Sequence, residues 1–332
     1  MHLVESPILL PNQTGFASTG GATKSAHRPH MVPSHYNSLD RSLIYLLHDE
    51  VAVRVLAGLS HSDLTRTASI IFNQDTYGCA TIARNALALL PSPQVIEAGA
   101  AAHVQHVMWC SWRTAQRITA SVPRQSWHFL GTEFLAEARG KPTVLIAPMT
   151  MPFIDVLSAI GDAFSERDVV IYGEGLSAST YDLDKYPNLT IMGEGSLKTS
   201  AAIIKTLERG GVFCTYPDFV YSGHPTITGC LFGRARNFSK AFISICSRPG
   251  VHLLPILLYR DSDTFQATIH EPVIIDAGKM VPKDIVRSLI LETIRHILED
   301  AICCKPEQWL LLGTLGAETY DMLPHQQTNL SR

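Results

Sequence analysis

Apolar residues recur at three- and four-residue intervals from about Leu39 to Arg117, the spacing that places them on one face of an α-helix. Three segments carry this pattern, and Ser60 or Ser62 is suited to cap one of the helices. They are SLIYLLHDEVAVRVLAGL, CATIARNALALL and VIEAGAAAHVQHVMWCSWRTAQRI. The pattern predicts that this part of the chain is helical.

Beyond SVPRQ the pattern changes to short β-rich runs that alternate with amphipathic segments. The runs predicted as strands are SWHFLG, TVLIAP, DVVIYG, NLTIMG, VFCTYPD, VHLLPILLYR and DTFQATIHEPVII. The predicted helices between and after them include PFIDVLSAIGDAF, SLKTSAAIIKTLERGG, SKAFISICSRPG and KDIVRSLILETIRHILEDAI. The last has an apolar stripe at Val286, Ile290, Ile294, Ile297 and Ala301. Such alternation predicts an α/β fold with a largely parallel, twisted sheet flanked by helices. We expect the N-terminal helices to pack on this sheet.

Composition narrows the class of protein. The chain has 332 residues, 46% of them hydrophobic and 17% charged, as expected of a globular domain. We predict a flexible segment over residues 1–38, one α/β domain over 39–320 and a flexible tail over 321–332. A net charge of −3 gives no reason to expect a nucleic-acid partner. Seven cysteines without a C-x-x-C pair, no secretory signal and no long apolar run favour a soluble cytoplasmic protein with reduced thiols.

The first candidate for a catalytic site is the segment KPTVLIAPMTMPFIDVLSAIGDAF, where a predicted buried strand is followed by Thr150 and then by Asp155. No glycine-rich phosphate loop and no G-x-S-x-G nucleophile elbow occurs in the chain. His103, His106 and Cys110 fall on one predicted helix. They could ligate zinc, but ordinary helix packing explains their spacing better, and no bound metal is predicted.

Several blocks, taken in order, resemble the lysophospholipid acyltransferase superfamily, and within it the late acyltransferases of lipid A biosynthesis. VLIAPMTMPFID is similar to the family's strand followed by His-x-x-x-x-Glu or Asp. LERGGVFCTYPDFVYSG, with Asp218, resembles the family's next loop, and GCLFGRARNFSKAFISIC, with Phe232 and Arg234, its Phe-Gly turn. The ending KPEQWLLLGTL resembles its Pro-Glu-Gln-Trp block. The resemblance covers roughly residues 40 to 315 and implies a glycerolipid acyltransferase-like fold.

The chain departs from this family where the chemistry lies. Thr150 stands at the position of the dyad histidine, and Asp155 at that of the acid. Gly173 or Glu174 stands where the family has an arginine, and the basic pair after the family's tryptophan is missing. These changes remove groups expected to recognise a phosphoglycolipid.

A threonine hydroxyl cannot act as a general base near neutral pH, so three alternatives remain open. Asp155 could act alone, with its pKa raised by burial at the mouth of an apolar pocket, while Thr150 donates a hydrogen bond to the oxyanion. His224, in the loop of Asp218, could serve as base. Thr150 or Cys214 could be a covalent nucleophile. In a purely structural alternative, the Thr150 hydroxyl caps the helix that starts near Pro152, and the Asp155 carboxylate lies near the positive end of that helix.

The sequence thus favours an acyltransferase-like enzyme that takes an acyl group from a carrier-protein or coenzyme A thioester to an amine or hydroxyl of a small molecule, in a specialised-metabolite pathway. No bound cofactor and no membrane span are expected. The alternatives are a catalytically decayed protein that binds a carrier protein or partner enzyme, a thioesterase or cyclase on a carrier-bound substrate, and a membrane-peripheral lipid acyltransferase. The expected catalytic residues are Asp155, Thr150 and His224, and the expected substrate contacts are Met149, Met151, Glu174, Asp218, Phe232 and Arg234.

Overall fold

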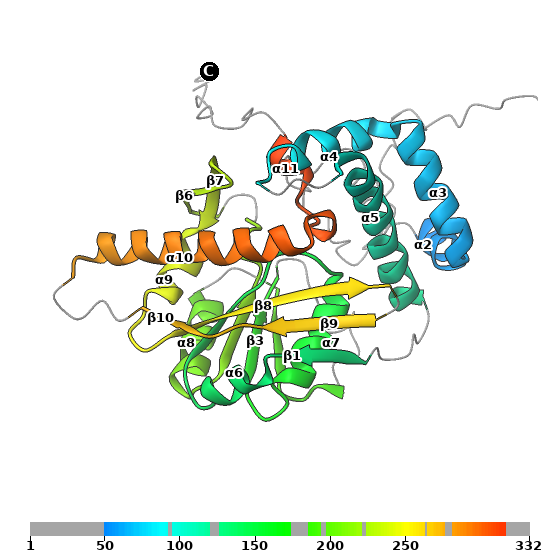
Figure 1. Cartoon of the computed structure of the whole chain (residues 1–332). Helices are drawn as coiled ribbons and strands as arrows, with labels where there is room; N and C mark the ends of the chain where they lie inside the picture. The colour runs from blue at the N-terminus through cyan, green and yellow to red at the C-terminus, as the bar shows by residue number, and fades with distance from the viewer. Residues whose placement is uncertain are drawn as a thin grey trace, which may run out of the picture. The chain divides into compact units, whose positions relative to one another are not determined.

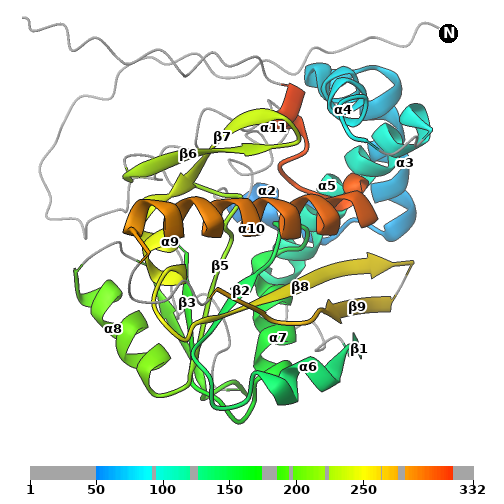
Figure 2. The same cartoon turned by 60° about the vertical axis from the view of Figure 1, so that its left-hand side comes forward.

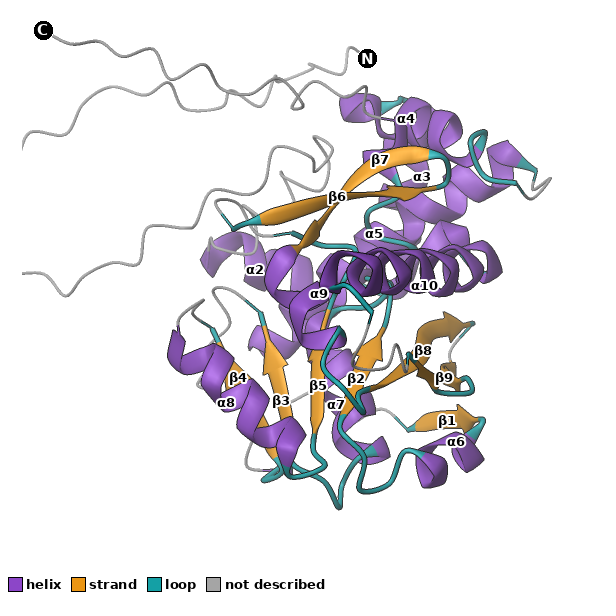
Figure 3. Cartoon of the chain, turned by 90° about the vertical axis from the view of Figure 1, so that its left-hand side faces the viewer, coloured by secondary structure: helices purple, strands orange, loops and turns teal. Residues whose placement is uncertain are grey.

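In the computed structural model, four short strands form the parallel centre of the main sheet. They lie in the order β2, β5, β3, β4, and every neighbouring pair is parallel. Their bounds are β2 (Thr143–Ile146), β3 (Val169–Tyr172), β4 (Leu189–Met192) and β5 (Val212–Thr215). Each strand was predicted from its β-rich run, and Figure 3 shows them side by side.

The sheet continues on the other side of β2 with the long strand β8 (His252–Asp261), which is parallel to β2. Its neighbour β9 (Thr264–Ile269) runs antiparallel to it, and β1 (Trp127–Leu130) pairs parallel with β9. The run predicted as one strand, DTFQATIHEPVII, is two strands, because β10 (Val273–Ile274) returns antiparallel along β8. The sheet is therefore mostly parallel with one reversed edge.

Both faces of β2, β3 and β5 are buried, as their continuous apolar runs require. Along β2, Leu145 faces a core that contains Leu157 and Ile160 of α7 (Phe153–Ala163). Its neighbours Val144 and Ile146 face a second core. This second core is completed by α8 (Leu197–Glu208), α9 (Lys240–Cys246) and α10 (Lys283–Cys304). Helices thus cover both faces (Figure 1).

The helical N-terminal portion shares these cores. It comprises α2 (Glu50–Ala57), α3 (His61–Asn73), η1 (Thr76–Gly78), α4 (Cys79–Leu87) and α5 (Ile96–Thr119). Trp109 of α5 lies in the same core as Leu145, and its ring centroid is 5.8 Å from that of Phe265 on β9. The prediction that these helices pack on the sheet is confirmed.

A two-stranded hairpin, β6 (Thr226–Leu231) and β7 (Arg234–Ser239), was not predicted as strands. Only its Phe-Gly turn was recognised: Phe232 and Gly233 both have positive φ, 51° and 73°, as a tight two-residue hairpin turn requires. Figures 2 and 3 show α10 between this hairpin and the main sheet. The fully buried residues of α10 are Ile290, Ile294, Leu298 and Ile302, while the predicted Val286 and Ile297 are partly buried against the same core. Leu298 and Ile302 were missed by the predicted stripe.

The structure describes residues 50–91, 95–119, 126–173, 185–193, 197–220, 224–262, 264–275 and 281–316. Shorter elements among them are α6 (Thr132–Glu137), η4 (Pro306–Gln308) and α11 (Gly313–Gly316). The domain limits expected at 38/39 and 320/321 lie outside these residues. Within the described ranges, no helix is long and apolar enough to cross a membrane.

Candidate functional site

The turn between β2 and α7 carries the threonine of the candidate pair. The chain leaves β2 through Ala147-Pro148 and enters α7 after Pro152. The Thr150 side chain is 1% exposed, and its hydroxyl donates a hydrogen bond to the backbone carbonyl of Leu258 on β8. The neighbouring Met151 is completely buried. The hydroxyl is therefore engaged by the protein.

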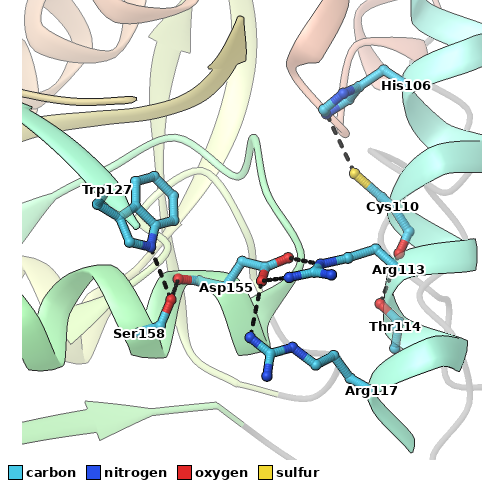
Figure 4. A network of polar contacts seen from close by, with 8 residues as sticks. All are labelled: His106, Cys110, Arg113, Thr114, Arg117, Trp127, Asp155 and Ser158. Carbon is cyan, nitrogen blue, oxygen red and sulfur yellow. Dashed lines mark hydrogen bonds and ion pairs between the residues drawn. The ribbon is translucent and has the colours of Figure 1, made fainter. Parts of the chain in front are cut away.

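Asp155, the third residue of α7, is 0% exposed and faces two arginines of α5 (Figure 4). Its Oδ2 is 3.3 Å from Nε of Arg113, and its Oδ1 is 3.4 Å from Nη2 of the same residue and 3.6 Å from Nη2 of Arg117. Burial raises the pKa of Asp155, and the two guanidinium groups oppose this shift. Both oxygens thus face cations of the protein, and not the mouth of an apolar pocket as expected.

One face of α5 supplies the contacts that surround the pair. His106, Cys110, Arg113 and Arg117 follow one another at intervals of three or four residues, as Figure 4 shows. The His106 Nε2 lies 2.7 Å from the carbonyl oxygen of Thr150. Since a carbonyl only accepts, this nitrogen must carry the proton. Burial lowers the pKa of His106 to about 3, so the ring is neutral at pH 7.

The described residues hold no group of three or more His, Cys, Asp or Glu side chains arranged to bind a metal, and the zinc candidates have other contacts. His103 Nδ1 lies 3.0 Å from the carbonyl oxygen of Glu307, on η4. The Cys110 sulfur lies 3.4 Å from His106 Nε2, which already donates to a carbonyl. The three side chains therefore serve helix packing.

Asp218, after β5, is the second buried carboxylate at this end of the sheet, with 1% of its surface exposed. Its Oδ2 accepts hydrogen bonds from the backbone N–H of Met149, at 3.0 Å, and from the indole Nε1 of Trp309, at 2.7 Å. Its backbone carbonyl accepts from Arg236 at 3.0 Å. Its Oδ1 is buried and has no hydrogen-bond partner in the described part of the chain. Burial raises the pKa of Asp218.

The segment that begins with the block KPEQW packs against the site. The backbone N–H of Leu310 donates to the carbonyl of Met149 at 2.9 Å. Gln308 binds both backbone groups of Arg260 on β8, at 2.9 Å to the N–H and 2.6 Å to the carbonyl. The segments of Met149, Asp218 and Trp309, far apart in sequence, thus meet at one point.

The other predicted site residues lie apart from this point or outside the described residues. His224 is half-buried just before β6, and its ring centroid is 6.4 Å from that of Tyr172. Phe232 and Arg234 sit at the hairpin turn, where the Phe232 N–H donates to Glu299 at 2.5 Å and Arg234 is exposed. Burial raises the pKa of the Cys214 thiol to about 12, which disfavours a nucleophilic thiolate. Glu174 lies outside the described residues.

Sequence reasoning missed Arg113 and Arg117, and it weighed His106 only as a zinc ligand and not as a partner of Thr150. An arginine among the apolar residues of α5, with a second one helical turn further on, was a usable signal, because a buried arginine needs an acidic partner. Comparison of the chain with protein-family models and with curated proteins finds no match.

Proposed function

We propose that this chain is an acyltransferase-like protein that binds a carrier protein or a partner enzyme without using Thr150 and Asp155 for catalysis. The observation that carries the proposal is that both side chains are fully buried and held by protein partners. Their positions match the family's dyad, but their contacts are those of structural groups. The carrier or enzyme partner follows from the resemblance to acyltransferases.

General-base catalysis needs a proton acceptor within hydrogen-bond reach of the substrate. The Thr150 hydroxyl already donates to Leu258. Asp155 has two guanidinium groups against its oxygens, so accepting a proton there would take the counter-charge from the buried Arg113 and weaken the contact with Arg117. His106 presents a protonated nitrogen to the Thr150 carbonyl. None of the three is placed to receive a substrate proton.

A second candidate function, acyl transfer, is favoured by Asp218. Its Oδ1 is buried without a hydrogen-bond partner among the residues that the structure describes, and a raised pKa suits a general base. In this reaction, an unprotonated amine of a small acceptor attacks the carbonyl carbon of an acyl thioester. The carbon–nitrogen bond forms, the carbon–sulfur bond breaks, and the proton lost by the nitrogen passes through Asp218 to the leaving thiolate. The donor would be an acyl carrier protein or acyl-coenzyme A.

One experiment separates the two functions. The protein is incubated with acylated carrier protein and an amine, and the mass of the carrier arm is followed while fluorescence anisotropy measures carrier binding. The variants are Asp155→Asn and Asp218→Asn. Asp284→Asn is the control, since its side chain is 92% exposed. We expect saturable carrier binding by all folded variants and no thioester loss above buffer.

Three outcomes discriminate. Thioester loss that disappears only in Asp218→Asn establishes the second candidate. Loss that disappears in a folded Asp155→Asn protein refutes the structural assignment of that carboxylate. Absence of carrier binding, with intact folding shown by circular dichroism, eliminates the carrier-binding proposal.

A further inference from the structure

A half-buried arginine lies at the amino ends of the central strands, the edge of the sheet opposite the candidate pair (Figure 3). Arg167, in the turn between α7 and β3, donates from Nη2 to the carbonyl oxygens of Lys141, at 2.6 Å, and Gly210, at 2.8 Å. The Thr143 hydroxyl accepts from the same nitrogen at 2.9 Å, and Nε donates to the Gly210 carbonyl at 3.2 Å. All of these acceptors are uncharged, so they do not neutralise the guanidinium.

The acids on either side of Arg167 in the sequence are paired with other arginines. Glu166 forms an ion pair with Arg139, and Asp168 lies 3.1 Å from Nη2 of Arg209. Among the described residues, no Asp or Glu forms an ion pair with Arg167. Burial lowers the pKa of Arg167 to about 10. A partly desolvated cation of this kind is stabilised by a counter-ion, and the described chain does not supply one.

Two nitrogen atoms at this edge are buried and have no hydrogen-bond partner among the described residues, Nη1 of Arg167 and Nδ1 of His252. His252 opens β8 and is the register partner of Thr143 on β2, so their side chains leave the same face of the sheet. The Thr143 hydroxyl also contacts Arg167, which brings the guanidinium and the imidazole together. Burial lowers the pKa of His252, and the nearby charges of Lys141 and Arg167 lower it further. Buried polar atoms without partners call for a ligand, an ion or water.

We propose that Arg167, His252 and Lys141 together bind one small oxyanion at the amino ends of β2 and β8. An oxyanion carries several acceptor oxygens around one charge, so it can accept from Nη1 of Arg167 and from a protonated Nδ1 of His252. It approaches the guanidinium end-on, because Nε and Nη2 already donate to the chain. The ion must be small, since both nitrogens are buried, and it enters past the exposed side chain of Lys141.

This site goes beyond the proposed function, because it lies at the edge of the sheet away from Thr150 and Asp155 and needs no partner protein. The same oxyanion chemistry can come from a free inorganic ion or from the carboxylate of a small organic acid. Titration calorimetry with sodium sulfate and with sodium acetate distinguishes the two sources. Sodium chloride keeps the ionic strength constant at pH 7, so that screening does not change during the titration.

Two variants test the cluster without disturbing Arg167, whose other nitrogens hold backbone carbonyls and whose loss would confound binding with folding. His252→Phe keeps an aromatic ring but removes both ring nitrogens, and Lys141→Gln removes the ammonium. The controls are His128→Phe and Lys205→Gln, which make the same changes at exposed positions on β1 and α8. We expect saturable binding to wild type, weakened about tenfold by His252→Phe, about threefold by Lys141→Gln and by less than about twofold in each control.

A second measurement follows the His252 ring by nuclear magnetic resonance. A bound anion favours the imidazolium form, so saturation with the ion should raise the pKa of His252. Binding of sulfate alone assigns the site to an inorganic ion, and binding of acetate alone assigns it to a carboxylate.

Three outcomes overturn the proposal. The first is that neither probe binds at 50 mM, about tenfold above a Kd of roughly 5 mM. The second is unchanged binding in both cluster variants, which would mean an adventitious ion only. The third is a bound ion that leaves the pKa of His252 unchanged. Loss of carrier binding alone, with oxyanion binding intact, refutes the proposed function and leaves this site standing.

Discussion

Asp155 and Asp218 are two buried carboxylates at the same end of one sheet, and they have opposite surroundings. Asp155 faces two guanidinium groups of α5, so its charge is compensated from within the protein. One oxygen of Asp218 accepts from two neutral N–H groups, and the other has no partner among the described residues. Asp155 is thus the better compensated of the two carboxylates.

In the proposed function, this difference means that the position of a catalytic acid has become structural while keeping its carboxylate. In the family that the sequence resembles, the acid orients a histidine. Here the acid is paired with arginines, and the hydroxyl at the histidine position is bound to a neighbouring strand. If the protein transfers acyl groups, Asp218 is the better general base, because its Oδ1 has no hydrogen-bond partner among the described residues. Four predictions test this contrast, beginning with the largest expected effect.

Replacing Asp155 by Ala leaves the buried guanidinium of Arg113 without the carboxylate that pairs with it, and removes an acidic neighbour of Arg117. We expect a loss of about 3–5 kcal/mol in the free energy of unfolding, measured by urea denaturation. Asp284→Ala, at an exposed position, should change it by less than about 0.5 kcal/mol. An apolar triple variant, Asp155→Leu with Arg113→Met and Arg117→Met, should recover most of the loss. A tolerated Asp155→Ala would show that the ion pairs are not structural.

Acidification should destabilise the protein through His103 and His106. Burial lowers their pKa values to about 4 and about 3, from 6.5. The unfolded chain therefore binds more protons below pH 6.5, so this contribution to stability is complete above pH 6.5 and is lost as the pH falls towards 4 and 3. Between pH 7 and 5 the loss is roughly 4 kcal/mol for the two rings.

The raised pKa values of Asp155 and Asp218 act in the opposite sense, since protonation in the folded state adds stability as the pH falls. The histidine contribution is therefore isolated by the double variant His103→Asn with His106→Gln, which keeps both donors in place. Its unfolding free energy should depend less on pH than that of wild type. Parallel pH curves for the two proteins would contradict the buried neutral state of these rings.

Trp309→Phe removes the indole donor to Asp218 while keeping a large aromatic ring. We expect a loss of about 1–3 kcal/mol, less than for Asp155→Ala, because the buried carboxylate keeps the N–H of Met149. Differential scanning calorimetry at pH 7 measures it. If the loss equals that of Asp155→Ala, the two carboxylates are equally dependent on their partners and the contrast fails.

Thr150→Val replaces the hydroxyl by a methyl group of nearly the same shape. The Leu258 carbonyl then loses its donor, and we expect a loss of about 1 kcal/mol. Thermal denaturation of Thr150→Val and Thr150→Ser separates the hydrogen bond from packing, since serine retains the hydroxyl. A stabilised Thr150→Val protein would mean that the hydroxyl contributes nothing to the fold.

Much of the fold was readable from the sequence, because strands buried on both faces and one-sided helices leave distinct apolar patterns. The failures are equally physical. Strands β6 and β7 carry few buried residues, so their pattern is weak. The buried stripe of α10 follows every fourth position from Ile290 to Ile302, a row inclined to the helix axis, which the predicted stripe did not follow.

The sequence alone determined the alternation of strands and helices and placed Thr150 and Asp155 at the end of β2. Only the tertiary structure decided what those side chains contact. The acceptor of the Thr150 hydroxyl lies 108 residues away on β8, and the arginine pairing with Asp155 comes from a helix 42 residues earlier. The local sequence pattern indicates which residues are buried. The partner of a buried polar group depends on which distant elements pack against it.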